Sequence, residues 1–296
     1  MDKRRELGEF LRSRRARVQP EELGLERTAR RRVPGLRRQE LAQLAGVSVD
    51  YYVRLEQGRA GHPSEGVLDA LAQALRLDGA ERSHLYDLAR PLRRSGRTPP
   101  PERVRPEVQR LLDSLESVPA MVMGRRMDVL AWNRLAPALF TGWDPLAPDQ
   151  RNMARRTFLD DDVRRLDPDW EEYARATVAQ LRLAAGRYPD DAELAALVAE
   201  LSGKSEEFRR WWADHDVKEK THGKKRVEHP IVGRLELSYE SFAVKGDSDQ
   251  ILVTWTAEAG SESEAALRLL ASLASSPPGD EPVAPGEAAS ETGQPR

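Results

Sequence analysis

The 296-residue chain is 39% hydrophobic and 32% charged, a composition typical of a soluble globular protein with room for two domains. It contains no cysteine, which excludes disulfides, thiol catalysis and cysteine-ligated metals. It has neither an apolar run long enough to cross a bilayer nor a secretory signal at its start, so we expect it in the cytoplasm. The net charge of -2 divides into +7 over residues 1–97 (21 basic minus 14 acidic residues) and -9 over the remainder, as expected when only the N-terminal part approaches a polyanion.

Residues 1–92 are expected to form a first, helical domain. Residues 6–17 place three apolar side chains on one face, which predicts an amphipathic helix. Residues 18–36 contain two prolines, two glycines and three consecutive arginines, and they predict mainly an extended basic loop. Three or four short helices follow up to Arg90, and Ser64 is in position to cap the third of them.

Residues 93–104 predict a linker to a second domain at 105–274, and residues 275–296 predict a disordered tail, because both segments are rich in residues that break helices or bury little. In the second domain, apolar alternation and helical periodicity predict two strands, several helices, two further strands and a last helix. The expected strands are 119–124, 127–132, 234–242 and 250–256. The expected helices are 106–116, 133–140, 168–186, 190–202, 205–214 and 263–274.

The strongest motif spans residues 38–59 and predicts two short helices that cross closely. Ala42 allows the close approach, Gly46 supplies a left-handed turn, Ser48 caps the second helix and Gly58 ends it. An ordinary helical hairpin would explain the apolar positions but not the joint placement of these small residues and the cap. The shared core is expected to contain Leu41, Ala45, Val47, Tyr52 and Leu55.

The outer face of the second helix is the surface that such motifs insert into the major groove of DNA. Arg54 is suited to a bidentate contact with guanine. Asp50 either accepts a hydrogen bond from cytosine or orients an arginine, and Arg38 and Arg59 are placed for phosphates. The residues expected to contact DNA are Arg38, Gln39, Ser48, Val49, Asp50, Tyr51, Arg54, Gln57 and Arg59.

Residues 37–59 and 62–75 resemble the lambda-repressor-like helix-turn-helix of bacterial XRE-family regulators. The segments 31–41 and 48–58 resemble more narrowly the MmyB-like subgroup. The resemblance implies base contacts by Ser48, Val49, Asp50 and Arg54, and backbone contacts by Arg38, Gln57 and Arg59. It also implies that Glu56 pairs internally with an arginine of the first helix, for which we choose Arg15. The long loop 18–36 departs from the shorter connection of repressors.

The resemblance extends through Leu273, and it implies a PAS-like C-terminal domain with a small antiparallel sheet that binds a small apolar ligand such as a fatty acid. The whole chain is then α+β, with an all-α domain first. Arg182 is the residue expected to hold a carboxylate. The alternative is that the aromatic residues are ordinary core and that Arg182 pairs with a nearby acid. The residues expected to bind the ligand are Trp132, Asn133, Arg182, Trp211, His229 and Tyr239.

Two patterns resemble metal sites, and for both we favour a structural explanation. His215, His222 and His229 recur every seven residues, but they lie in a charged stretch expected to be irregular. Residues 160–162 are three aspartates, which are more typical of a solvated loop or helix start than of a cation site. We therefore expect no metal and no resident cofactor.

We expect a regulator that binds a palindromic operator in double-stranded DNA as a homodimer and responds to a small molecule, with no membrane contact. One alternative is a constitutive DNA-binding regulator whose C-terminal domain only dimerises or recruits a partner. Another is an enzyme with a DNA-targeting module. The sequence offers no phosphate-binding glycine loop, serine nucleophile elbow or zinc-protease motif for the last, so we expect no enzyme.

Overall fold

The structure is a computed structural model, and it describes residues 2–24, 35–90, 102–140, 151–218, 221–247 and 249–275. Most of the predicted linker, residues 93–101, lies outside the described residues, as does the predicted tail from residue 276 on. The three consecutive arginines at 30–32 lie outside them as well. Within the described residues, no helix is long and apolar enough to cross a membrane.

The described residues of the N-terminal region form helices joined by short turns and loops and contain no strand, as predicted. Its elements are α1 (Lys3–Arg17), η1 (Pro20–Leu23), α2 (Arg38–Leu44), α3 (Val49–Glu56), α4 (Glu65–Ala74) and α5 (Gly79–Ala89). Side-chain oxygens of Asp2, Ser48, Ser64 and Asp78 accept hydrogen bonds from the first turns of α1, α3, α4 and α5. One core of leucines, Phe10 and Tyr52 joins these helices.

The helices of this region approach one another closely at Gly8 of α1. A Cβ atom on Gly8 would lie 2.3 Å from the backbone oxygen of Glu56, at the end of α3. Only glycine therefore allows α1 to lie against the backbone of α3 at this point. This close approach places the side chains of α1 within reach of the buried face of α3.

The C-terminal region is built on a five-stranded antiparallel sheet in the order β2-β1-β5-β4-β3. The strands are β1 (Ala120–Met123), β2 (Val129–Trp132), β3 (His222–His229), β4 (Gly233–Ala243) and β5 (Ile251–Thr256). The helices are α6 (Pro106–Ser114), α7 (Leu135–Leu139), α8 (Met153–Leu159), α9 (Asp161–Leu166), α10 (Trp170–Arg187), α11 (Ala192–Lys204), α12 (Glu206–Ala213) and α13 (Glu262–Ser275). The predicted α+β class is confirmed.

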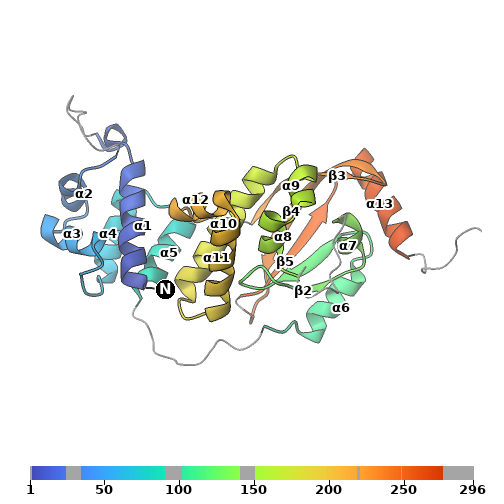
Figure 1. Cartoon of the computed structure of the whole chain (residues 1–296), viewed down its shortest axis with the longest axis horizontal. Coiled ribbons are helices and arrows are strands. Elements are labelled where there is room, and N and C mark those ends of the chain that lie inside the picture. Colours follow the sequence, from blue (N-terminus) through green and yellow to red (C-terminus); the bar gives the residue numbers. More distant parts are fainter. Residues whose placement is uncertain are drawn as a thin grey trace, which may run out of the picture.

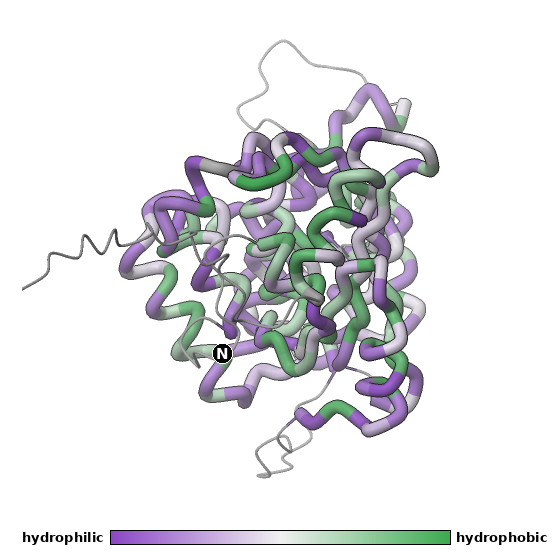
Figure 2. The backbone as a smooth tube through the Cα atoms, turned by 90° about the vertical axis from the view of Figure 1, so that its right-hand side faces the viewer, coloured by the Kyte–Doolittle hydropathy of each residue, from purple (hydrophilic) through white to green (hydrophobic). Residues whose placement is uncertain are grey.

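Different helices pack against the two faces of the sheet. Because side chains alternate along a strand, Ala120 and Val122 of β1 face a small cluster with α6, whereas Met121 and Met123 face the main core. The main core also contains residues of α7, α8, α10, α11, α12 and α13. Figure 1 shows α8 and α10 beside the sheet, with α10 between the sheet and the N-terminal helices. Hydrophobic segments gather toward the interior of the molecule (Figure 2).

One expectation about this region was wrong, and two helices were missed. The charged stretch around His222, expected to be irregular, is strand β3, which pairs along its whole length with β4. Its basic side chains conceal the alternation, because lysine and arginine can bury their aliphatic stems while the charge stays in water. Helices α8 and α9 were not predicted, because short helices carry too few residues to show a clear period.

Candidate functional site

The first candidate site is the outer face of α3, which the predicted turn positions. Gly46 adopts a φ of 64°, and the amide of Val47 donates to the oxygen of Ala42 at 3.0 Å, so the chain reverses directly after α2. The Ser48 hydroxyl accepts from the amide of Tyr51, which caps α3. Gly58, with a φ of 67°, ends the helix. The predicted helix-turn-helix geometry is confirmed.

Glu56 fixes α3 from its buried side. Its side chain is fully buried, and its two carboxylate oxygens accept hydrogen bonds of 2.7 Å from Nε of Arg15 and of 2.7 Å from Nε of Arg38. Burial raises the pKa of Glu56, but the hydrogen bonds from the two arginines outweigh burial and hold that pKa below its usual value. The predicted Arg15–Glu56 pair is confirmed, and Arg38, which we expected near phosphates, also pairs with this carboxylate.

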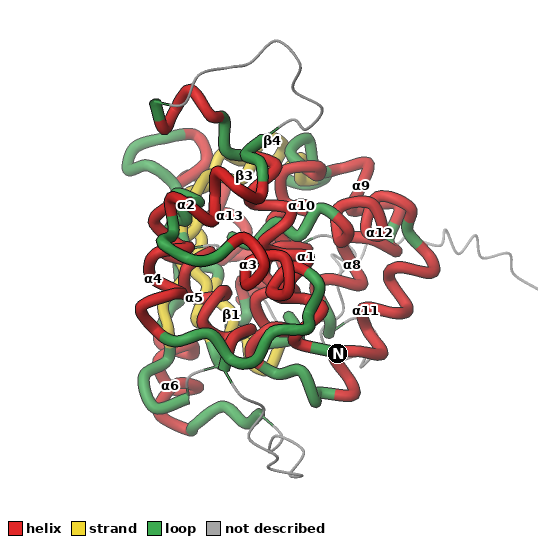
Figure 3. Tube along the Cα trace, turned by 90° about the vertical axis from the view of Figure 1, so that its left-hand side faces the viewer, coloured by secondary structure: helices red, strands yellow, loops and turns green. Residues whose placement is uncertain are grey.

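Several residues of α3 remain exposed on the opposite side. Val49, Asp50, Arg54 and Gln57 are exposed, and Arg59 is exposed just beyond the helix. Gln39 and Ser48 are exposed too, whereas Tyr51 is half-buried against the core. Figure 3 views the molecule from the end at which α3 lies, with the sheet behind it. This exposed face therefore lies at the end of the molecule away from the C-terminal sheet.

The second candidate site is a cavity of about 260 Å³ between the sheet and helices α8 to α10. Its lining combines apolar side chains with polar and charged ones. The apolar lining includes Met121, Met123, Met127, Phe140, Met153, Val253 and Trp255. The polar lining includes Arg156, Thr157, Asp167, Gln180, Lys218, Lys224 and Lys225.

Arg156 is the buried cation of this cavity. Its side chain is 7% exposed, and burial lowers the pKa of its guanidinium despite the Asp160 carboxylate 3.5 Å away. The neighbouring Tyr173 also lines the cavity, and burial raises its pKa to about 12, so its hydroxyl stays protonated at neutral pH. A pocket with apolar walls and a small number of placed polar groups is the usual form of a small-molecule site.

Two family models match the chain. Residues 6–85 match a helix-turn-helix domain. Residues 104–270, more than half of the chain, match the MmyB-like transcription regulator ligand binding domain. The chain belongs to the MmyB-like transcription regulators. No curated protein matches it. The two matched domains make this chain a DNA-binding transcription regulator, with the exposed face of α3 in the first match and the cavity in the second.

The methionines in the lining of this regulator's cavity were not among the residues that we expected to bind the ligand. The sequence has five methionines, and every one except Met1 lines the cavity. Methionine is flexible and polarisable, so it is suited to a wall that adapts to an apolar ligand. Its concentration within residues 121–153 of a methionine-poor sequence was the available signal.

The residues that we expected to bind the ligand are separated in this MmyB-like domain. Tyr239 lines the cavity. The side-chain amide of Asn133, just after β2, forms hydrogen bonds with four backbone groups, including those of Ala120 in β1 and Ala136 in α7. One ring nitrogen of His229 contacts the backbone oxygen of Ala138, and the other accepts from two amides of the β3–β4 turn. Trp132 and Trp211 pack with the main core, and Arg182 lies on the side of α10 that faces the N-terminal helices.

The histidines and aspartates of the two patterns that resemble metal sites lie in a strand, after a helix and at the start of a helix. His222 and His229 stand at opposite ends of β3, and His215 follows α12. Asp160 caps α9 by accepting from the amides of Asp162 and Val163. A different group, Glu6, Glu9 and His215, brings its donor atoms within 4.8 Å of one another.

Proposed function

We propose that this regulator binds its operator in a sequence-specific manner through α3, and that the cavity binds a fatty acid that modulates DNA binding. The observation that carries the proposal is the cavity lined by four methionines and by the buried Arg156. The apolar wall suits an acyl chain, and the guanidinium suits a carboxylate because it offers a bidentate hydrogen bond. Arg156 thus takes the role for which Arg182 was expected.

The carboxylate contact gives a direct test of this pocket. Replacing Arg156 with methionine is expected to weaken fatty-acid binding about 10- to 100-fold, because a charged hydrogen bond of about 1.5–3 kcal/mol is lost. Isothermal titration with saturated acids from octanoic to hexadecanoic acid measures it. Arg155→Met is the matched control, since the neighbouring Arg155 is more exposed and pairs with Glu200. Equal binding by Arg156→Met and the control would refute the carboxylate contact.

The exposed face of α3 gives a second test. Arg54→Ala is expected to lower affinity for the DNA upstream of the regulator's own gene by about 1–3 kcal/mol and to relax preference at one base pair, as for loss of a bidentate guanine contact. Arg76→Ala is a control, because Arg76 is an exposed arginine paired with Glu22 away from α3. Binding to a library of base substitutions measures both effects. An unaltered preference in Arg54→Ala would remove Arg54 from the base-contacting surface.

A homodimer completes the proposed function, because two copies of α3 would occupy half-sites about one helical turn apart. Analytical ultracentrifugation of the regulator with operator DNA gives the stoichiometry. One protomer per operator would contradict the dimer. If none of the fatty acids binds, the proposed ligand class is wrong, and a C-terminal domain that only dimerises or recruits a partner is the alternative to test next.

A further inference from the structure

Helix α10 contacts both the cavity and the helix-turn-helix domain. Tyr173, Ala176 and Gln180 lie on its cavity side. Arg182 follows Gln180 by two residues and therefore points roughly 200° around the helix axis, away from the cavity. On that side, a Cβ atom on Gly186 would lie 2.5 Å from the His84 ring of α5, so the helix lies directly against the helix-turn-helix domain. A displacement of α10 at the cavity would therefore change the contact between α10 and the helix-turn-helix domain.

Arg182 is the central group of the contact. Its side chain is 2% exposed, and its Nη1 lies 3.0 Å from a carboxylate oxygen of Glu6 on α1. The same atom lies 3.0 Å from Nδ1 of His215, and Nη2 donates to the backbone oxygen of Trp212. The guanidinium carbon stands 4.1 Å from the centre of the Trp212 ring. Burial lowers the pKa of Arg182 to about 10, so the group keeps its charge at neutral pH.

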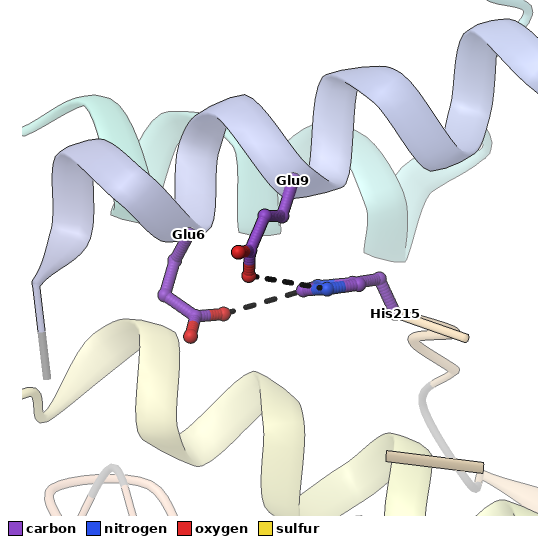
Figure 4. Close-up of side chains that lie close together, drawn as sticks. All are labelled: Glu6, Glu9 and His215. Atoms are coloured by element: carbon purple, nitrogen blue, oxygen red, sulfur yellow. Dashed lines mark ion pairs between the residues drawn. The ribbon is translucent and has the colours of Figure 1, made fainter. Parts of the chain in front are cut away.

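His215 completes an interdomain cluster of Glu6, Glu9, Arg182 and His215, whose two glutamates and histidine are drawn in Figure 4. Burial lowers the pKa of His215 to about 4, so its ring is neutral and its Nδ1 accepts from Arg182. Its Nε2 then carries the proton and faces Glu9, 3.5 Å away. Nη1 of Arg182 thus lies within 3.0 Å of both Glu6 and Nδ1 of His215.

The cluster is connected to the DNA-contacting helix through α1. Glu6 and Glu9 lie in the first half of α1, and Arg15 near its end holds Glu56 of α3. Arg14, between them, donates to the backbone oxygen of His215 at 2.5 Å. A single helix of 15 residues therefore carries both the interdomain contacts and the support of α3.

We propose that α10 transmits occupancy of the cavity to the helix-turn-helix domain, with Arg182 as the positioning residue that ties α10 to α1. This proposal rests on the proposed function of the cavity. A ligand couples two sites only when the element between them makes different contacts in the ligand-bound and ligand-free states. The interdomain cluster supplies contacts that a movement of α10 would make or break. The contact of Arg187 with Asp87 at 3.5 Å also joins the two domains, but Arg187 is 51% exposed.

The test separates binding from transmission. Hydrogen exchange of α1, measured by mass spectrometry with and without dodecanoic acid, is expected to change about fivefold or more in the wild-type protein. In Arg182→Met the acid still binds by titration, but the exchange of α1 no longer responds. Glu6→Gln should repeat this result from the other domain and leaves the ligand-binding domain unaltered. Arg175→Met, on the same helix but paired with Glu171 of that helix, should respond as wild type does.

A pocket-filling variant tests the transmission without a ligand. Ala176→Trp places a large side chain in the cavity, so the exchange of α1 should change without any acid, and the added Arg182→Met substitution should abolish this change. If dodecanoic acid does not bind the wild-type protein, the proposed ligand class fails and this variant still decides the transmission. Retention of the full response in Arg182→Met or in the double variant would overturn the proposal.

Discussion

Replacing Glu56 with glutamine is expected to destabilise the helix-turn-helix domain by about 3–5 kcal/mol, the usual cost of removing one partner from a buried ion pair. The carboxylate is fully buried and holds two arginines, and Arg15 is only 9% exposed. Without the carboxylate, the Arg15 guanidinium stays buried with uncharged partners such as the backbone oxygen of Leu36, at 2.7 Å. An amide cannot replace the lost charge. The change should also abolish DNA binding, because α3 loses its support.

Urea unfolding followed by circular dichroism measures this loss of stability. Glu65→Gln is the matched control, because Glu65 is exposed in the first turn of α4 and its replacement should change stability by less than about 0.5 kcal/mol. If Glu56→Gln unfolds at the same urea concentration as this control, Glu56 does not carry the domain's stability. A second replacement, Arg38→Met, should have a smaller effect, since Arg38 is 48% exposed.

The helix-turn-helix could be predicted from the sequence because its determinants are local. Gly46, Ser48 and Gly58 each set one backbone conformation, and their spacing leaves few alternatives for the helices between them. The Arg15–Glu56 pair was expected from the family resemblance, and the structure adds Arg38 to it. Periodicity alone does not indicate which arginine a buried glutamate contacts.

The cavity could not be predicted in the same way, because its lining comes from segments more than 100 residues apart. Met121 and Trp255 meet only after β1 and β5 have paired, and Arg156 belongs to a short helix with a weak pattern. Arg182 also shows the limit of the sequence. An arginine in a helix full of acids and alanines has no feature that distinguishes a ligand contact from a contact between domains.

Acid is expected to weaken the contact between the two domains through His84. Burial lowers the pKa of His84 to about 3, and the charges of Arg182 and Arg14 add to this effect. Below the ordinary histidine pKa of about 6.5, the unfolded chain binds a proton at this residue that the folded protein does not bind. The folded state therefore loses about 1.4 kcal/mol per pH unit from this group as pH falls through that range, or about 2 kcal/mol at pH 5.

His84→Phe isolates this contribution. The His84 ring packs edge-on against Phe10 with ring centres 5.1 Å apart, and its Nδ1 has no hydrogen-bond partner among the described residues, so phenylalanine preserves the packing and removes the titration. Compared with wild type, the variant should gain about 2 kcal/mol of stability between pH 7 and pH 5 in urea unfolding. His222→Phe, at the exposed start of β3, should show the wild-type dependence. Parallel pH profiles for His84→Phe and wild type would mean that acid acts elsewhere, with His215 the next group to replace because burial lowers its pKa to about 4.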